Sequence, residues 1–256
     1  MTNPTKTPIA LITGGSRGLG RSMALHLAER GVDIIFTYRA AAAEANKVRE
    51  HIRSLGRKVV ALPLDVTDTG KFEAFATAVA HELDRTWGRQ QFDYLVNNAG
   101  VSMHAGVFET TEAQLDEVYN VNFKGPFLLT QSLLPLIADG GRILNVSSGL
   151  ARMTIPGSGV YGAMKAGLET LTRYMAKELG ARKITANIIA PGAIETDFSG
   201  GMVRDNPEVK KMVASMTALG RPGLPDDIGG AVAMLLAPES GWINGQRIEV
   251  SGGMGL

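Results

Sequence analysis

The stretch Ile9-Ala-Leu-Ile-Thr-Gly-Gly-Ser-Arg-Gly-Leu-Gly20 decides the fold of this 256-residue chain, because it joins a short apolar strand to a glycine-rich turn. Glycines at Gly14, Gly18 and Gly20 allow a tight turn and a close approach of the backbone to a ligand. A segment with helical periodicity follows at once, so the amide groups of a helix N-terminus come next to the turn. The spacing differs from Gly-x-Gly-x-x-Gly, and its place directly after the first strand is what indicates nucleotide binding.

Short apolar runs recur along the whole chain and alternate with longer segments of helical periodicity. The runs are residues 9–13, 34–37, 59–64, 92–96, 142–147, 185–190 and 247–250. Each is apolar throughout rather than at every second residue, as expected for parallel strands that are covered on both faces. No internal repeat or proline- and glycine-rich linker divides the chain. The pattern predicts one α/β domain over residues 1–256, with a doubly wound parallel sheet between two layers of helices.

The composition excludes several classes of protein. Lysine and arginine number 26 against 25 aspartates and glutamates, so neither nucleic acid nor a membrane surface is expected as a partner. The absence of cysteine excludes disulfides, thiol catalysis and Cys-bound zinc, and the four scattered histidines lack metal-ligand spacing, so no metal site is expected. No apolar run approaches the roughly 18 residues of a membrane span or forms a signal-peptide core. These features predict a cytoplasmic protein that binds a small molecule.

The end of the second strand reads Thr37-Tyr-Arg39 and carries no carboxylate. Sites that prefer NAD place an acidic side chain about 20 residues past the glycines, where it binds the ribose hydroxyls. Here Tyr38 and Arg39 stand at that position, and Arg17 lies inside the glycine-rich turn. Two guanidinium groups match a 2′-phosphate as planar bidentate donors. The sequence therefore predicts NADPH (NADP) as the cofactor.

Polar or glycine-rich segments also end four later strands of the predicted sheet. They are Asp65-Val66, Asn97-Asn-Ala-Gly100, Ser147-Ser148 and Pro191-Gly-Ala-Ile-Glu-Thr196. The carboxyl ends of the strands form the edge where open α/β sheets bind ligands. We therefore expect these segments to lie around one site.

Tyr161-Gly-Ala-Met-Lys165 supplies a candidate for proton transfer, because a helix would place the phenol and the ammonium one turn apart on one face. A free tyrosine has a pKa of about 10, and a neighbouring cation lowers that value. Such a tyrosine is a plausible general acid or base.

Taken together, these residues resemble the short-chain dehydrogenase/reductase family over essentially the whole chain. The matching positions, in family order, are Thr13 with Gly18 and Gly20, Asp65, Asn97 to Gly100, Asn122, Ser148, Tyr161 with Lys165, and Pro191-Gly192. Within the family the chain is similar to 3-oxoacyl-carrier-protein reductases and related ketoreductases. The resemblance implies a Rossmann fold with a seven-stranded parallel sheet and a homotetramer, in which helices beginning near Thr111 and Tyr161 pair between subunits.

The resemblance also implies catalytic roles for four residues. Tyr161 would donate the proton, and Lys165 would lower the tyrosine pKa and bind the nicotinamide ribose. Ser148 would donate a hydrogen bond to the substrate carbonyl, and Asn122 would hold a water in the proton relay.

Residues expected to bind the cofactor, from the strand ends or from the resemblance, form a larger set. They are Gly14, Ser16, Arg17, Gly18, Leu19, Gly20, Tyr38, Arg39, Asp65, Val66, Asn97, Ala99, Gly100, Tyr161, Lys165, Pro191, Gly192, Ile194 and Thr196. Asp65 and Val66 would contact the adenine and Asn97 the adjacent ribose. Ile194 and Thr196 would contact the carboxamide end.

Residues 195–224 fit the alternation least and are expected to form a substrate-binding lid. The positions expected to line the substrate pocket are Ser102, Met103, Ala151, Met153, Ile155, Gly192, Ala193, Met202, Met212 and Met216. This set is apolar and rich in methionine, which adapts to irregular shapes, so it favours a hydrophobic ketone or acyl chain over a free sugar.

The expected activity is the NADPH-dependent reduction of a ketone, either a 3-oxoacyl thioester or a hydrophobic carbonyl compound, to a secondary alcohol. Two alternatives stay open: an alcohol or sugar dehydrogenase that works in the oxidative direction, and a non-catalytic NADP(H) sensor. A sugar-nucleotide epimerase can share Tyr-x-x-x-Lys, but those relatives are longer and carry a different glycine spacing.

Overall fold

Seven parallel strands form the centre of the protein, in the order β3-β2-β1-β4-β5-β6-β7. The computed structural model describes residues 7–256. The strands are β1 (Ile9–Ile12), β2 (Asp33–Tyr38), β3 (Val59–Pro63), β4 (Phe92–Asn97), β5 (Ile137–Val146), β6 (Thr185–Pro191) and β7 (Arg247–Val250). The order reverses between β1 and β4, which is the switch point where doubly wound sheets bind ligands. The predicted single-domain fold is confirmed.

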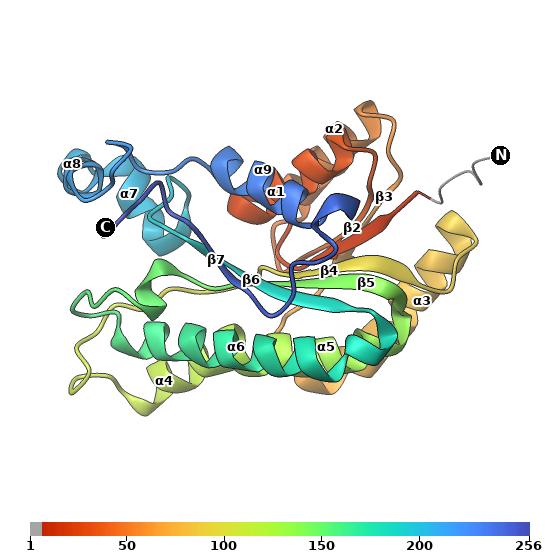
Figure 1. Ribbon diagram of the computed structural model, residues 1–256, viewed down its shortest axis with the longest axis horizontal. Helices are drawn as coiled ribbons and strands as arrows, with labels where there is room; N and C mark the ends of the chain where they lie inside the picture. Colours follow the sequence, from red (N-terminus) through yellow and green to blue (C-terminus); the bar gives the residue numbers. More distant parts are fainter. Residues whose placement is uncertain (1–6) are drawn as a thin grey trace.

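Helices cover both faces of the sheet (Figure 1). One layer contains α1 (Gly18–Glu29), α2 (Ala42–Ser54) and α9 (Pro225–Leu235), and the other contains α3 (Phe72–Trp87), α4 (Glu112–Tyr119), α5 (Gly125–Leu133) and α6 (Gly159–Glu178). Strand β1 shows why its run is apolar throughout: Ala10 and Ile12 pack in one hydrophobic core, whereas Ile9 and Leu11 pack in the other. Side chains of a strand alternate between the two faces, and here both faces are buried.

The helix that follows β4 contains an irregular turn at a predicted site residue. It begins with a capping box, in which the Thr111 hydroxyl accepts from the Gln114 N–H at 3.3 Å and the Gln114 side chain accepts from the Thr111 N–H at 3.0 Å. Between α4 and α5 the chain forms a π-helical turn, η2 (Asn120–Lys124), which contains Asn122. Such turns are rare and occur often at functional sites.

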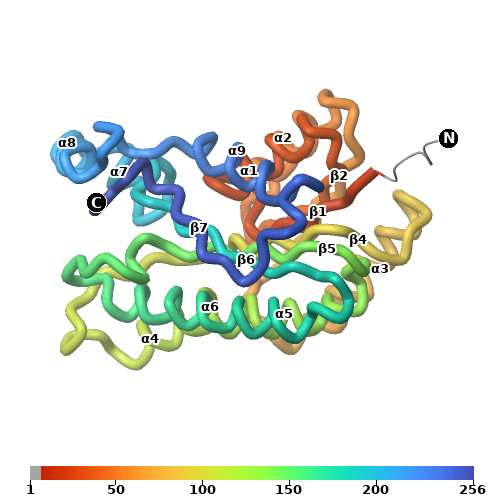
Figure 2. The backbone as a smooth tube through the Cα atoms, viewed as in Figure 1, coloured from red at the N-terminus to blue at the C-terminus, as the bar shows by residue number. Residues whose placement is uncertain are grey.

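The structure departs from the predicted elements at two places. Strand β5 begins at Ile137 rather than at position 142, and its first half is irregular: Gly140 takes a positive φ of 78°, and the register to β4 shifts between Phe92 and Tyr94. Residues 195–224 form the short helices η6 (Phe198–Gly201), α7 (Met202–Asp205) and α8 (Pro207–Ser215). Figure 2 shows α7 and α8 beside the C-terminal residues, where Thr217 forms a bridge to Met254. Both ends of this segment meet at the bridge between Ile194 and Gly223.

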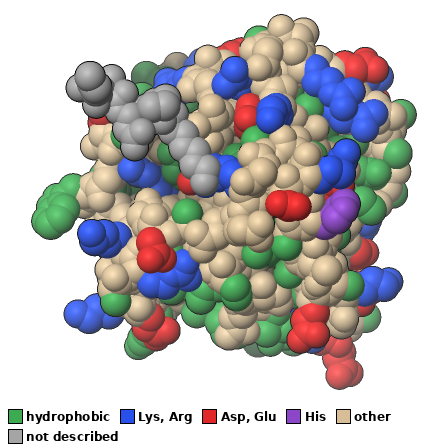
Figure 3. Space-filling model, turned by 90° about the vertical axis from the view of Figure 1, so that its right-hand side faces the viewer, with side chains coloured by type: hydrophobic (Ala, Val, Ile, Leu, Met, Phe, Trp, Pro, Cys, Tyr) green, Lys and Arg blue, Asp and Glu red, His purple; other side chains and the backbone are tan. Residues whose placement is uncertain are grey.

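Charged side chains of both signs are interspersed on the face drawn in Figure 3, in keeping with the nearly balanced composition. Within residues 7–256, no helix is both long and apolar enough to cross a membrane. The same residues contain no group of three His, Asp or Glu side chains placed to hold a metal ion.

Candidate active site

A cleft of about 550 Å³ runs along the carboxyl edge of the sheet. It collects the segments that follow β1 to β6, and every residue expected to bind the cofactor lines it except Asn97. Of the four catalytic candidates, Ser148, Tyr161 and Lys165 line the cleft and Asn122 does not. Lining residues that the sequence analysis missed include Thr37, Ala40, Ala41, Leu64, Asn98, Val101, Val121, Val146, Leu150, Asp197, Phe198, Ser199 and Val203.

The glycine-rich turn has the geometry of a phosphate cradle. Gly14 and Gly18 take positive φ values of 68° and 53°. A Cβ atom on Gly20 would lie 2.2 Å from the Gly14 carbonyl oxygen, so only glycine fits there. Helix α1 starts at this point without a side-chain cap at Arg17 and without an acidic residue in its first turn. Its first amide groups are therefore free to bind an anion, and these residues fit the pyrophosphate of a dinucleotide.

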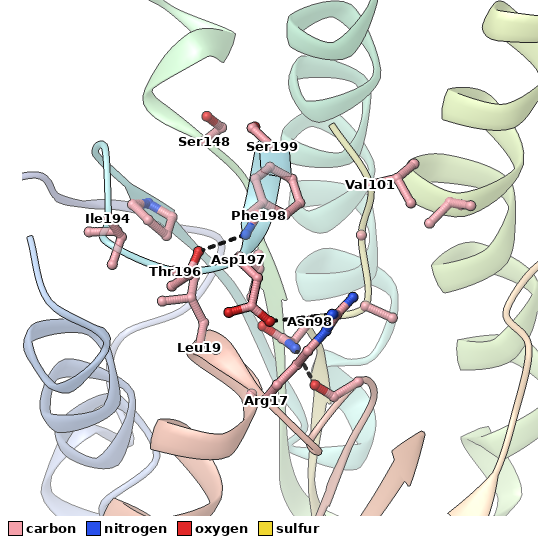
Figure 4. A pocket seen from close by; sticks show the side chains of 18 of the residues that line it. Arg17, Leu19, Asn98, Val101, Ser148, Ile194, Thr196, Asp197, Phe198 and Ser199 are labelled. Atoms are coloured by element: carbon pink, nitrogen blue, oxygen red, sulfur yellow. Dashed lines mark hydrogen bonds and ion pairs between the residues drawn. The ribbon is translucent and has the colours of Figure 1, made fainter. Parts of the chain in front are cut away.

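Both arginines expected at the ribose end lie near carboxylates, which the sequence analysis missed. Nη1 of Arg17 is 3.3 Å from Oδ2 of Asp197, on the segment after β6 (Figure 4). Arg39 lines the cleft near Asp65. The backbone N–H and the hydroxyl of Thr67 donate to Asp65 Oδ1 at 2.9 and 2.8 Å, and with Arg39 and Lys71 they hold the pKa of Asp65 below its usual value.

Tyr161 and Lys165 are buried together, with exposed fractions of 7% and 4%. The Lys165 ammonium lies 5.6 Å from the centre of the Tyr161 ring and donates to the Val146 carbonyl at 2.9 Å. Burial raises the pKa of Tyr161 to about 12, and the nearby Ser148 hydroxyl opposes this effect. Burial also lowers the pKa of Lys165 to about 8.

The net shift of the Tyr161 pKa is upward, because the effect of burial dominates, and the expected lowering by Lys165 stays a prediction. The Lys165 ammonium itself donates to the Val146 carbonyl at 2.9 Å. The phenol is protonated at neutral pH.

Phe198 explains part of this burial. Its ring centre lies 6.2 Å from that of Tyr161, with the two ring planes tilted by 55°. Figure 4 shows Phe198 between Thr196 and the Ser148 side of the cleft, and its backbone N–H donates to the Thr196 hydroxyl at 3.1 Å. An aromatic residue two positions after Thr196, in the segment that follows the Pro-Gly strand end, was the signal in the sequence.

Asn122 is fully buried behind the cleft rather than at its surface. Its Nδ2 donates to the carbonyls of Val101 and Val118 at 3.0 and 3.2 Å, and its Oδ1 accepts from the Val101 N–H at 3.4 Å. The side chain thus fixes Val101, which lines the cleft. Asn122 thus lies behind the wall of the cleft, and its role in a proton relay stays a prediction.

Asn97 is the other site residue that the structure does not place at the cleft. Its Nδ2 donates to Thr130 and Asn145 at 2.9 and 2.8 Å inside the core. Neighbouring side chains at a strand end point to opposite sides, so Asn98 takes the place at the cleft. Its Nδ2 donates to the carbonyl of Thr13 at 2.8 Å and thereby joins β4 to the glycine-rich turn.

Most of the expected substrate-pocket residues lie elsewhere. Gly192 and Ala193 line the cleft, but Ser102, Met103, Ala151, Met153, Ile155, Met202, Met212 and Met216 do not. Met202 of α7 and Met212 of α8 are exposed and do not line the cleft, to which α7 contributes Val203 instead. Met153 lies in a separate hollow beside the C-terminal residues.

A doubly wound sheet whose carboxyl edge carries a glycine-rich turn and a buried Tyr–Lys pair defines a dinucleotide-binding oxidoreductase of the Rossmann fold. A family model described as enoyl-(acyl carrier protein) reductase matches residues 14–255. Tetrahydroxynaphthalene reductase PfmaG of Pestalotiopsis fici is 37% identical over 262 residues, which span 98% of this chain and 92% of that protein.

Two solved structures agree with this chain closely. A short-chain dehydrogenase/reductase from Serratia marcescens has a TM-score of 0.91 and 33% identity, and the match covers 99% of this chain and 100% of that one. Angucycline C-6 ketoreductase LanV with bound NADP has a TM-score of 0.92 and 34% identity, with 98% and 96% covered. The chain belongs to the short-chain dehydrogenase/reductase family, whose members are oxidoreductases that act on ketone and alcohol groups.

Proposed function

We propose that this protein reduces a hydrophobic ketone to a secondary alcohol with NADPH. The observation that carries the proposal is the meeting of Ser148, Tyr161 and Lys165 in one cleft with the uncapped start of α1. NADPH, when bound, supplies the hydride. The chain supplies the proton and the groups that stabilise negative charge on the carbonyl oxygen.

A protonated Tyr161 can serve as the proton donor in ketone reduction. With a pKa of about 12 the phenol holds its proton at neutral pH, as a general acid must. Ser148 would donate a second hydrogen bond to the developing alkoxide, in the manner of an oxyanion hole. Lys165 would bind the nicotinamide ribose and stabilise the phenolate that forms. In an oxidative dehydrogenase the same residue would act as the general base in its phenolate form.

NADPH is supported by the chemistry at the ribose end of the cleft. Arg17 and Arg39 line it, and strand β2 ends without a carboxylate. Guanidinium groups bind a phosphate in a planar, bidentate manner. The similar ketoreductase LanV was solved with NADP.

A hydrophobic carbonyl compound is the substrate class that fits the cleft best. Leu150, Ile194, Phe198 and Val203 give the cleft apolar lining, and Phe198 lies beside Tyr161. Similar proteins are named for the reduction of tetrahydroxynaphthalene and of angucyclines, which supports a cyclic aromatic ketone over a 3-oxoacyl thioester.

Residues 195–224 would act as the lid over the substrate. The two ends of this segment are joined by the bridge between Ile194 and Gly223. Between them, the Phe198 ring lies beside the Tyr161 ring.

A homotetramer is the assembly we propose. Helices α4 and α6 contact each other along one face, and Leu115, Tyr119 and Tyr174 on them are 42%, 39% and 62% exposed. Sedimentation velocity at micromolar concentration tests this assignment, and a monomer alone would contradict it.

The function is tested by NADPH oxidation with a panel of cyclic aromatic ketones, 3-oxoacyl thioesters and small activated ketones. We expect the highest turnover for the cyclic aromatic ketones.

Tyr161→Phe should lower kcat by about 10²-fold to 10⁴-fold, as expected for a lost general acid, with the NADPH dissociation constant little changed. NADPH binding without turnover of any ketone would contradict the proposal and favour a sensor. More than a tenth of the parent kcat in Tyr161→Phe would contradict the assignment of the acid.

A further inference from the structure

Arg247 connects three elements directly behind the proposed catalytic serine. Its side chain is only 7% exposed and begins β7. Nε donates to Glu169 Oε1 at 2.6 Å, and Nη2 donates to the Ser148 carbonyl oxygen at 3.3 Å. Nη1 pairs with Glu249 on the same strand. Each of the three nitrogens thus has its own partner.

Glu169 brings α6 into the same cluster. It lies on α6 two turns beyond Tyr161 and one turn beyond Lys165, and its side chain is 10% exposed. Its Oε1 also accepts from the Ser147 hydroxyl at 2.6 Å. The cluster therefore joins the end of β5, which carries Ser148, to the helix that carries Tyr161.

Stability alone is a weak reason to bury these charges. Moving a guanidinium and a carboxylate out of water costs several kcal/mol each, and a packed apolar pair is often as stable. An Arg–carboxylate cluster instead fixes the relative orientation of the groups that it binds, because the N–H groups of the planar guanidinium point in fixed directions. Here one of these N–H groups points toward the peptide carbonyl of Ser148. That carbonyl also accepts from the Ala151 N–H at 3.1 Å.

We propose that Arg247 is a positioning residue, which fixes Ser148 relative to Tyr161 through the Ser148 carbonyl and through Glu169. The inference rests on the proposed function, since it assigns Ser148 and Tyr161 to the reacting carbonyl. Arg247 does not line the cleft, so we expect it to act through Ser148 and Glu169 rather than by contact with substrate or cofactor. Its effect is therefore on kcat rather than on cofactor binding.

Arg247→Lys tests the proposal, because lysine keeps the charge opposite Glu169 but lacks the planar fork that reaches the Ser148 carbonyl as well. We expect kcat for ketone reduction to fall by about 10-fold to 100-fold, since small displacements of catalytic groups have effects of that size. The NADPH dissociation constant and the thermal midpoint should stay close to the parent values. A purely structural role predicts the opposite: kcat per NADPH-binding site stays at the parent value, whatever the change in stability.

Arg142→Lys is the matched control. Arg142 is also largely buried and donates to backbone carbonyls, those of Leu235 and Pro238, but these lie away from Ser148. Its replacement should leave kcat per binding site unchanged. An equal loss of kcat in both lysine variants would overturn the inference.

A second variant covers the case in which Arg247→Lys does not fold. The double variant Arg247→Met/Glu169→Gln removes both charges together, so no buried charge is left unpaired. A folded double variant that binds NADPH but has lost most of its kcat supports the inference, and parent-like kcat overturns it. Turnover by the parent protein separates a failure of the proposed function from a failure of the inference about Arg247. A parent that is inactive toward every ketone overturns both. An active parent whose Arg247 variants keep the parent kcat overturns the inference alone.

Discussion

Arg17 and Asp197 face each other at the mouth of the cleft, with Nη1 3.3 Å from Oδ2, and join the glycine-rich turn to the segment after β6. Asp197 also pairs with Arg204 of α7, at 2.9 Å. The Arg17 and Asp197 side chains are 70% and 44% exposed. An exposed ion pair contributes about 1 kcal/mol at most. A phosphate group that approaches Arg17 can therefore compete with Asp197.

Asp197→Asn should strengthen NADPH binding, because it frees Arg17 from a competing carboxylate. An energy of about 1 kcal/mol corresponds to an effect of up to about fivefold in the dissociation constant. NADH lacks the 2′-phosphate, so its affinity should change less. The measurement is fluorescence titration with both cofactors. Asp205→Asn is the control, since Asp205 pairs with Arg204 and not with Arg17. Equal strengthening for NADH and NADPH would show that Asp197 does not compete with the 2′-phosphate.

The titration of Lys165 should be visible in the pH dependence of stability. Burial lowers its pKa to about 8 from an ordinary value of 10.5, so the folded protein loses this proton at a lower pH than the unfolded chain does. Between these two values the unfolded state binds more protons, and the free energy of unfolding rises with pH. Lys165→Met lacks this contribution. The free energy of unfolding of the variant relative to the parent should therefore be highest below pH 8 and fall as the pH increases.

The measurement is urea unfolding of both proteins between pH 7 and pH 9.5. One pKa unit corresponds to about 1.4 kcal/mol, so the relative change over the whole titration is a few kcal/mol at most. The range ends at pH 9.5 so that ionisation of Tyr161 does not contribute. The raised pKa of Tyr161 would lower the free energy of unfolding only as the pH rises above about 10. Lys177→Met is the control, since Lys177 is an exposed lysine on the same helix. Parallel curves for Lys165→Met and the parent would contradict the lowered pKa.

Phe198→Ala should widen the cleft next to Tyr161. Aromatic pairs contribute about 0.5 to 1.5 kcal/mol beyond their buried area, so kcat/KM for a small ketone should fall by about twofold to tenfold. Bulky cyclic ketones should lose less or gain, because the space left by the ring becomes available to them. Phe108→Ala is the control, since Phe108 is fully exposed and does not line the cleft. Equal losses for small and bulky ketones would mean that Phe198 does not select by size.

The fold followed from the sequence because strands such as β1, β2, β4 and β6 are buried on both faces and so appear as continuous apolar runs. The polar segments after these runs marked the edge of the sheet, and the glycine-rich turn marked its switch point. The early start of β5 was not predicted, because Asp-Gly-Gly at residues 139–141 is typical of a turn, whereas the structure continues the strand through it with a positive φ at Gly140.

The parts of the site that were missed depend on three-dimensional placement. Whether Asn97 or Asn98 faces the cleft depends on which side of β4 its side chain leaves. The pKa of Tyr161 depends on burial by Phe198 and its other neighbours, which the spacing to Lys165 does not reveal. Arg247 lies far from Ser148 in the sequence and contacts it only because β7 ends the sheet beside β6.

Arg39→Asp should move the cofactor preference toward NADH. Arg39 is exposed at the end of β2 and lines the cleft, so it is free to bind a 2′-phosphate that carries close to two negative charges. A hydrogen bond to a charged group contributes roughly 1.5 to 3 kcal/mol, which corresponds to about a tenfold to hundredfold preference. Exposure and the nearby Asp65 carboxylate should hold the effect near the lower end of that range.

The measurement for Arg39 is the ratio of kcat/KM for NADPH and NADH in the parent, in Arg39→Gln and in Arg39→Asp. The glutamine variant removes the attraction, and the aspartate variant adds a repulsion, so the ratio should fall in that order. A shift that appears only in the aspartate variant would mean that Arg39 does not bind the phosphate in the parent. Equal use of both cofactors by the parent would refute the assignment and leave Tyr38 or the backbone as the group that determines binding at the ribose end.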